Sequence, residues 1–143
     1  MCYSTIELWR LVMKHAIFAA AFVSFAWVLP ALALDLNSFR AQHRLPALAA
    51  SATLAGAAYA HAHDMANCKH LDHNGFRARM GAVASTAAEN VAFGCDTEDC
   101  AIRMWAKSAG HRRNMLMQGI SSYGIASATA DNGRRYWVLE LGN

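Results

Sequence analysis

The last third of the chain restricts the possible folds, because its hydrophobic pattern consists of two apolar runs around a turn. The runs are YGIASATA (123–130) and RRYWVLEL (134–141), and Asp131-Asn132-Gly133 stands between them. An Asn-Gly pair between apolar runs is a strong short-range signal for a β-hairpin. Since a hairpin is only marginally stable by itself, we expect a third strand near Val91-Ala92-Phe93 and helices packed on the sheet.

Upstream of the hairpin the pattern is helical. Asp35 is a suitable N-cap for a helix over LNSFRAQHR (36–44), and Ser51 is one for a longer, alanine-rich helix over 52–66. A short helix is expected at FRARM (76–80). One stripe of the long helix recurs at helical spacing and is expected to be buried. It consists of Leu54, Ala58, His61 and Met65.

The middle of the chain completes this pattern. An extended segment is expected within 85–94. Thr97 then caps a helix over EDCAIRMWAKSA (98–109), Gly110 ends it, and HRRNML (111–116) follows as a tight turn or single helical turn. Helices that precede a hairpin favour an α+β fold with a small antiparallel sheet.

The N-terminus has the pattern of an export signal. Arg10 and Lys14 precede the apolar run AIFAAAFVSFAWVL (16–29), which is followed by the small-residue signal Ala31-Leu32-Ala33. This order predicts a secretory signal peptide over residues 1–33. The run is shorter than the roughly 20 residues that a membrane-spanning helix needs, although an uncleaved N-terminal anchor is the alternative. Translation could begin at Met1 or at Met13.

Removal of the signal would leave one domain, residues 34–143, with no stable membrane span and a secreted or periplasmic location. Lys and Arg there number 11 and Asp and Glu number 9, a net charge of +2. The basic residues are scattered in pairs, Arg112-Arg113 and Arg134-Arg135 among them, a pattern typical of solvated surface. Nucleic acid is therefore not an expected partner.

Export permits disulfide bonds. The predicted mature domain contains three cysteines, so one thiol remains unpaired. Cys95 and Cys100 bracket a short turn and are predicted to be bonded to each other, while a bond between Cys68 and Cys95 is the rival. The chain has no C-x-x-C pair that would favour a structural zinc site.

Three polar side chains are candidates for a functional site. His73 lies in a polar turn, where the neighbouring Asp72 could orient its ring. Glu89 is surrounded in sequence by Ala, Val and Phe, and a carboxylate in apolar surroundings is costly unless it is paired. His111 directly follows the expected helix end at Gly110.

Each candidate also has a structural interpretation. His73 could be a turn residue bonded to backbone, and His111 could be favoured by the dipole at a helix end. Glu89 could accept hydrogen bonds from backbone amides or from Arg77 or Arg79. The residues alone leave these alternatives open.

His73, Glu89 and His111 would together suffice for zinc or another divalent cation with water positions open. No histidine pair has the H-E-x-x-H spacing. His61 and His63 lie two residues apart on a helix, hence on nearly opposite faces, so they cannot bind one ion together. We expect His61 to be a core histidine.

A hydrolytic pair of Ser108 and His111 is disfavoured, because the sequence lacks a nucleophile elbow and an evident oxyanion arrangement. The sequence therefore supports no firm catalytic assignment and no bound organic cofactor.

Two central motifs resemble those of the CAP superfamily, which groups cysteine-rich secretory proteins, antigen 5 and plant pathogenesis-related 1 proteins. AENVAFG (88–94) resembles G-E-N-[IV]-A-x-G. WAKSAGHRRNM (105–115) resembles the bacterial form W-x-x-S-x-G-H-R-x-N-[IL]. Tyr123-Gly124-Ile125-Ala126 and Tyr136-Trp137 resemble the closing strands of the same family.

The opening helix carries a further match. Phe39-Arg40-Ala41 with Leu45-Pro46-Ala47-Leu48 resembles N-x-x-R-x-x-x-G-L-P-x-L, with Arg44 at the position where glycine is usual. The matching motifs occur in the family's order and extend over essentially all of residues 34–143, so the resemblance is specific.

The resemblance implies an α-β-α sandwich with a cavity lined by two histidines and two glutamates, which can hold a divalent ion. His73 matches the first histidine and Glu89 the first glutamate. Ser108 stands where eukaryotic members have the second glutamate. The second histidine would fall near Arg135-Tyr136-Trp137, where there is none, and the bacterial motif suggests that His111 lines the cavity instead.

The family's usual role implies a non-enzymatic binding domain for a lipid, a sterol or a protein partner. The alternative is a metal-assisted hydrolase or protease that uses His73, Glu89 and His111 around an ion such as Zn²⁺, with Glu89 as the base.

Overall fold

The structure is a computed structural model that describes residues 32–143. The predicted signal peptide therefore lies almost entirely outside the described residues. None of the helices between residues 32 and 143 has the length and apolar character needed to cross a membrane. In chain order the elements are α1 (Leu36–Gln42), β1 (Ala49–Ala50), α2 (Ala52–Cys68), α3 (Phe76–Met80), β2 (Ala87–Phe93), α4 (Glu98–Lys107), α5 (Ala109–Met115), β3 (Ser122–Thr129) and β4 (Arg135–Gly142).

The four strands form one sheet in the order β1-β3-β4-β2. The predicted hairpin is confirmed as the antiparallel pair β3 and β4. The third strand, β2, includes 91–93 and lies within the extended segment expected at 85–94. It pairs with β4 along its whole length, from Ala87 opposite Gly142 to Phe93 opposite Tyr136. The sheet also has one short parallel pairing that we did not predict, where Ala49 and Ala50 of β1 lie beside β3.

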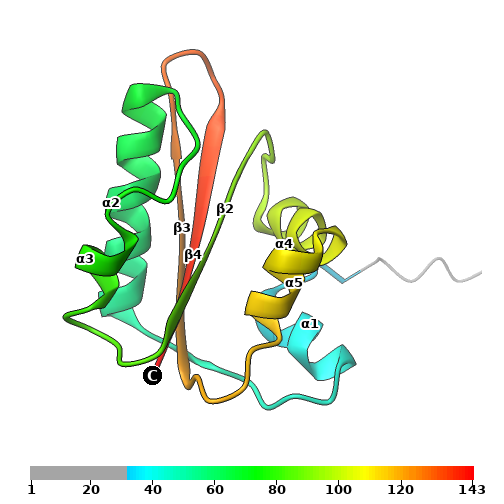
Figure 1. The fold of residues 1–143 in the computed structure, drawn as a ribbon. Coiled ribbons are helices and arrows are strands. Elements are labelled where there is room, and N and C mark those ends of the chain that lie inside the picture. The colour runs from blue at the N-terminus through cyan, green and yellow to red at the C-terminus, as the bar shows by residue number, and fades with distance from the viewer. Residues whose placement is uncertain (1–31) are drawn as a thin grey trace, which may run out of the picture. The chain divides into compact units, whose positions relative to one another are not determined.

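The helices lie on the two faces of this sheet, so the fold has three layers (Figure 1). Helices α2 and α3 lie on one side, and α1, α4 and α5 lie on the other. Each interface has its own apolar core. On the α2 side the core includes Ala58, Ala62, Met65, Val91, Tyr136 and Val138. On the other side it includes Leu36, Phe39, Ile102, Trp105, Leu139 and Leu141.

Local capping explains where three helices begin. The side chains of Asp35, Ser51 and Thr97 each accept a hydrogen bond from a backbone N–H in the first turn of the helix that follows, as predicted. Arg44 lies just after α1, at the position where the resembling motif has glycine. Its φ is 60°, in the left-handed region that glycine enters at little cost. A glycine at this position, as in the resembling motif, would relieve that cost.

The prediction that one helix continues from 98 to Gly110 was wrong. Helix α4 ends at Lys107, and Ser108 has an extended backbone that starts the separate helix α5. Gly110 lies inside α5 instead of ending α4. Gly110 therefore does not end a helix. The segment 111–116, expected as a tight turn or a single helical turn, supplies most of the longer helix α5.

Helices α4 and α5 hold the outer edge of β2 through side chains. Trp105 Nε1 donates a hydrogen bond of 3.0 Å to the carbonyl of Val91. Asn114 Nδ2 donates to the carbonyl of Glu89 at 3.2 Å and to Oδ1 of Asn90 at 2.9 Å. The unpaired backbone groups of an edge strand need partners, and here the Trp and Asn of the bacterial motif provide them.

Cys95 and Cys100 form a disulfide bond, as predicted, and Cys68 is a free, exposed thiol. The bond fixes the loop before α4 to the first turn of that helix. In the same turn, Asp99 Oδ1 accepts a hydrogen bond of 2.5 Å from the backbone N–H of Leu34, which joins the start of the domain to α4.

Candidate functional site

Strand β2 sends consecutive side chains to opposite faces of the sheet. Asn90 belongs to the α5 side, where its Nδ2 donates a hydrogen bond of 3.0 Å to the carbonyl of His111. Glu89 belongs to the α2 side together with Val91, which packs in the core beneath that helix. The segment Ala88-Glu89-Asn90 thus places an amide under one helical layer and a carboxylate under the other.

Glu89 is buried, with 6% of its surface exposed, and both of its oxygens are engaged. Its Oε1 lies 2.7 Å from His73 Nδ1. Its Oε2 accepts a hydrogen bond from the guanidinium of Arg79 and lies 3.9 Å from His61 Nε2. Of the structural partners considered for Glu89, Arg79 is the one that the structure shows, and Glu89 also contacts His73.

His73 is the exposed end of this arrangement. Its side chain is 54% exposed, in contrast to the 2% of the Glu89 side chain that it contacts. Because Nδ1 is bonded to Glu89, the ring is oriented and its Nε2 remains available to a ligand.

Glu140 is a second buried acid, directly opposite Glu89 on strand β4. It is fully buried, and its Oε1 lies 3.4 Å from Arg79 Nε. Burial raises the pKa of Glu140 to about 8, and the facing Glu89 adds to the rise through hydrogen bonding and charge, whereas Arg79 opposes it. Glu140 is therefore an uncharged carboxylic acid at neutral pH.

One oxygen of Glu140, Oε2, has no hydrogen-bond partner within residues 32–143 when both acids act only as acceptors. A proton on Glu140 removes this deficit, because a protonated carboxyl becomes a donor and the facing Glu89 carboxylate is an acceptor. The unpaired buried oxygen and the raised pKa thus agree that Glu140 is protonated.

His111 and Ser108 belong to the opposite helical layer, on or next to α5. Burial lowers the pKa of His111, and the positive charge of His73 lowers it further, so the two rings are within electrostatic reach of each other. Ser108 is half-buried at the junction of α4 and α5, and its side chain makes no capping hydrogen bond there. The direct contact in the predicted set is therefore that of His73 with Glu89.

These side chains do not fit a divalent cation as they stand. Both oxygens of Glu89 and the Nδ1 of His73 are already used, and the guanidinium of Arg79 supplies the positive charge beside Glu89. In residues 32–143 no group of three or more His, Cys, Asp or Glu side chains is arranged to hold a metal ion. Arg79 is thus the cation that pairs with Glu89 in this structure.

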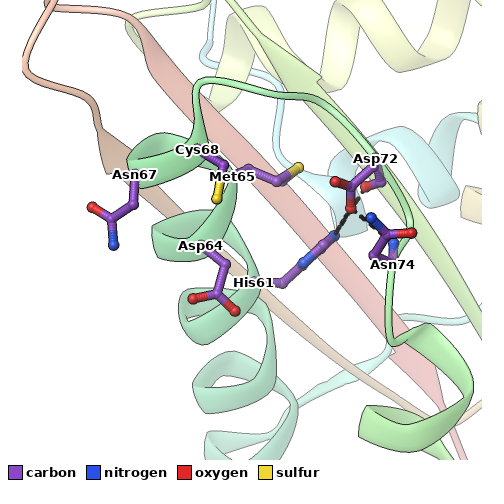
Figure 2. A pocket seen from close by; sticks show the side chains of 7 residues that line it. All are labelled: His61, Asp64, Met65, Asn67, Cys68, Asp72 and Asn74. Atoms are coloured by element: carbon purple, nitrogen blue, oxygen red, sulfur yellow. Dashed lines mark hydrogen bonds and ion pairs between the residues drawn. The ribbon is translucent and has the colours of Figure 1, made fainter.

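Two depressions flank this cluster. One, of about 490 Å³, is an open surface hollow formed by His73 and the residues up to Ala78. The other, of about 430 Å³, lies between α2 and the turn that contains Asp72 and Asn74. Figure 2 shows that His61 reaches from α2 toward Asp72 on the floor of this second pocket. His61 Nε2 lies 2.9 Å from the backbone oxygen of Asp72.

Sequence reasoning identified some of these residues and missed others. Arg79 was considered only as a structural partner of Glu89, and Glu140 was not considered. His61 is buried on the α2 stripe as expected, but it also contacts the polar cluster. The signal for Glu140 was present, because it is a lone acid inside the apolar run that forms β4. Its meaning depends on pairing with Glu89, which is distant in sequence.

The architecture, an α-β-α sandwich with motif residues on β2 and α5, is that of a CAP domain. The model of the cysteine-rich secretory protein family matches residues 35–141, and the chain belongs to this family.

Similar proteins agree with this assignment. The uncharacterized protein YkwD of Bacillus subtilis (strain 168) is 29% identical over 97 residues, which cover 62% of this chain and 38% of YkwD, so this chain spans well under half of that relative.

Solved structures support the fold. An outer surface protein from Borrelia burgdorferi superposes with a TM-score of 0.68 at 16% identity, covering 76% of this chain and 86% of the other. An extracellular protein with an SCP domain from Bacillus anthracis superposes with a TM-score of 0.65 at 24% identity, covering 76% of this chain and 37% of the other.

Proposed function

We propose that the protein is an exported, non-enzymatic binding domain whose recognition surface is centred on His73. The observation that carries this proposal is the arrangement of one exposed imidazole on a buried support. Glu89 holds Nδ1 of His73, and Arg79 holds Glu89. A side chain fixed in this way loses little entropy when it binds, which favours recognition.

Binding is favoured over hydrolysis because Glu89, the base in the hydrolase alternative, is already paired. A general base needs a free lone pair within reach of the proton it removes, and both oxygens of Glu89 are engaged. The side-chain hydrogen bond of His73 that the structure describes goes to Glu89, so no nucleophile is bonded to the ring there. No observation favours the metal-assisted hydrolase.

A protein partner fits this surface better than a lipid or a sterol does. Small apolar ligands bind in cavities that enclose most of their surface. The hollow beside His73 is open, and polar or charged residues such as Asn74 and Arg77 contribute to it. An open hollow with a mainly apolar lining and a fixed imidazole beside it suits a protein interface.

Export is part of the proposal. The signal-like pattern of residues 1–33 predicts removal of that segment, and a disulfide between Cys95 and Cys100 is consistent with an oxidising compartment. The solved relatives described as an extracellular and an outer surface protein support the same location. We therefore infer a mature domain that starts at Leu34.

The test is site-specific cross-linking in the native compartment. A photo-reactive amino acid replaces Arg77, which is exposed beside His73, and a cross-linked protein is then identified and purified. We expect this partner to bind the wild-type domain, with an affinity at least tenfold lower for His73→Ala and Glu89→Gln. The Arg134→Ala variant, which alters an exposed residue on the distant hairpin turn, is the control.

Two results would contradict the proposal. One is a stoichiometric lipid in protein purified from its native compartment, with no cross-linked partner. The other is a cross-linked partner whose affinity is the same for the wild type and for His73→Ala.

A further inference from the structure

The two edges of the sheet differ in how their backbone groups are satisfied. Strand β2 is one edge, and side chains of α4 and α5 donate hydrogen bonds to its outward carbonyls. At the other edge, the two-residue strand β1 pairs only with Ser122 and Tyr123 of β3. On that side, residues 124–129 of β3 have no strand beside them within the described part of the chain. Most of β3 is therefore an open edge of the sheet.

Alternate residues of β3 direct their backbone N–H and C=O groups toward this open edge. In an antiparallel pair, only every second residue exchanges hydrogen bonds with the neighbouring strand. Ala130, directly after β3, donates its N–H to the carbonyl of Arg134 at 2.8 Å, which turns the even-numbered residues of β3 toward β4. The odd-numbered residues face outward, and the carbonyl of Tyr123 accordingly accepts from the N–H of Ser51 at 2.8 Å. The outward groups beyond that point belong to Ile125, Ser127 and Thr129.

These outward groups have no partner within residues 32–143. The chain turns away from the edge at Ser51, whose carbonyl accepts from the N–H of Ala55 in α2 at 2.9 Å, so β1 does not continue to Ile125. Apart from the pairing with β4, no hydrogen bond of the described residues uses the backbone of Ile125, Ser127 or Thr129. Strand β3 contains no charged residue and no proline, which are common devices that keep an edge strand from pairing. The edge is therefore free to pair with another strand.

Helix α2 runs along the whole of β3 (Figure 1). At one end, a side chain at Gly124 would collide with the backbone of Ala55, so the helix and the strand are in close contact there. At the other end, Lys69 just after α2 pairs with Asp131 just after β3, at 2.9 Å. One flank of α2 therefore borders the open edge along its length.

That flank has an exposed aromatic side chain. Tyr59 lies one helical turn after Ala55, on the same side of α2, and 56% of its surface is exposed. His61, on the opposite side of the helix, reaches toward Glu89 on β2, so Tyr59 is directed to the β3 side. An isolated peptide on the edge would satisfy the backbone of β3 and leave Tyr59 exposed. A second copy of the domain, which has its own helix beside its own strand, would cover both.

We propose that the open edge of β3 pairs with the same edge of a second copy of this chain. The two sheets then form one continuous antiparallel sheet across a twofold axis, and Tyr59 of each copy packs against α2 of the other. A twofold interface has to be self-complementary. An uncharged strand with alternating outward N–H and C=O groups meets this requirement in antiparallel pairing.

The chain that leaves the edge at Ser51 sets the register. Because Ser51 continues the line of β1 beside β3, the second copy cannot extend past Ile125. A twofold axis at Ala128 satisfies this limit and pairs Ser127 of each copy with Thr129 of the other, and each such pair exchanges two backbone hydrogen bonds. The hairpin turn of the second copy then ends beside a hollow of about 410 Å³ to which Ser51 and Ile125 contribute.

This interface goes beyond the proposed function and leaves its surface free. His73 contacts Glu89 on β2, which is the edge strand at the other side of the sheet. A dimer formed through β3 would therefore present two His73 surfaces. Two linked sites strengthen binding to a partner that offers both at once.

Sedimentation equilibrium of protein purified from its native compartment tests the proposal. We expect a dimer that dissociates on dilution. Ser127→Pro removes an outward N–H and no hydrogen bond to β4, so it should keep the fold and raise the dimer dissociation constant at least about tenfold. Ser127→Ala is the matched control, because it keeps the N–H and should leave the dimer unchanged. Circular dichroism and thermal unfolding verify the fold of each variant.

Two further measurements locate the interface. The amides of Ser127 and Thr129 should exchange with solvent more slowly as the concentration of the wild type rises, whereas the amide of Ala128, which faces β4, should not change. Tyr59→Ser should weaken the dimer by roughly tenfold. His63→Ala, which alters another exposed aromatic ring of α2, is its control.

A protein that is monomeric at every concentration would overturn the proposal, and so would a dimer that is equally stable in Ser127→Pro and Ser127→Ala. If Ser127→Pro does not fold, the wild type decides, because exchange rates at Ser127 and Thr129 that do not depend on concentration would also overturn it. A monomer whose Ser127 and Thr129 amides are protected by a different, co-purified protein would show that the edge is not occupied by a second copy.

Discussion

Single residues at the site are arranged so that their charges nearly cancel. Glu89 is a carboxylate, Arg79 is its cation, and Glu140 is held as a neutral acid by burial and by the facing Glu89. Burying one charge is costly unless it is paired, and here one proton and one guanidinium compensate for two acids. This balance supports the exposed His73 without any further cation.

The raised pKa of Glu140 makes stability depend on pH. In the unfolded chain this carboxyl ionises near its ordinary value of 4.5, whereas in the folded domain it stays protonated until about pH 8. The contribution of neutral Glu140 to the free energy of unfolding is therefore complete below pH 4.5, and it is lost as the pH rises toward 8. We expect the free energy of unfolding of the wild type to fall by on the order of 2–4 kcal/mol over this window, relative to Glu140→Gln.

Urea unfolding at pH 5, 6.5 and 8 measures this difference. Glutamine has a similar shape and does not titrate, so other ionisable groups contribute equally to both proteins. Parallel pH profiles for the wild type and Glu140→Gln would show that Glu140 is ionised in the folded state.

A second prediction at this scale concerns the two histidines. The charge of His73 contributes to the lowered pKa of His111. We expect His73→Ala to raise the pKa of His111 toward its ordinary value, without restoring it fully, because burial is the larger cause. An NMR titration of the His111 ring measures this shift, and His63→Ala, which changes an exposed histidine on α2, should leave it unchanged. If the pKa of His111 were unchanged in His73→Ala, the charge of His73 would have no effect on His111, which would contradict this prediction.

At the scale of elements, the edge of β2 depends on side chains from α5. Asn114→Ala would remove the donor to the carbonyl of Glu89 and to Oδ1 of Asn90. Because buried acceptors would then lack partners, we expect a loss of about 1–3 kcal/mol in the free energy of unfolding. Amide hydrogen exchange within β2 should also accelerate. Asn67→Ala, an exposed asparagine on α2, is the control, and equal losses in both variants would contradict the role of Asn114.

The start of the domain gives another prediction. If export removes residues 1–33, the backbone N–H of Leu34 that contacts Asp99 becomes a charged α-amino group. Its bond to Asp99 would then be an ion pair. We expect Asp99→Asn to lower the melting temperature of the protein starting at Leu34 by more than that of the unprocessed chain. Equal losses, or a mature N-terminus other than Leu34, would exclude this contact.

The sequence predicted those elements that have local signals. The caps at Asp35, Ser51 and Thr97 and the Asn-Gly turn depend on a few neighbouring residues, and each was found as expected. The pairing of β1 was not predicted, because a two-residue strand has no periodicity of its own. Likewise, the partnership of Glu89 with Glu140 depends on the register of two strands, which local pattern does not give.

At the scale of the whole molecule, the sandwich places its polar residues between layers. Glu89 extends from the sheet toward α2 and α3, and His111 belongs to the layer on the other side. The exposed His73 contacts Glu89 directly. His61, which lies 3.9 Å from Glu89, lines the pocket that also contains Asp64. The fold therefore holds the exposed His73 on a buried support whose cation is Arg79.

The most direct test of this account is the effect of zinc on thermal unfolding of the wild type and of Arg79→Met. With Arg79 beside Glu89, we predict that the melting temperature of the wild type is the same in EDTA and in excess Zn²⁺. The Arg79→Met variant leaves Glu89 without its cation, so its melting temperature should be lower than that of the wild type and should rise when Zn²⁺ is added. A wild-type protein that is stabilised by Zn²⁺, with the effect lost in Glu89→Gln, would contradict the claim that Arg79 is the resident cation of this site.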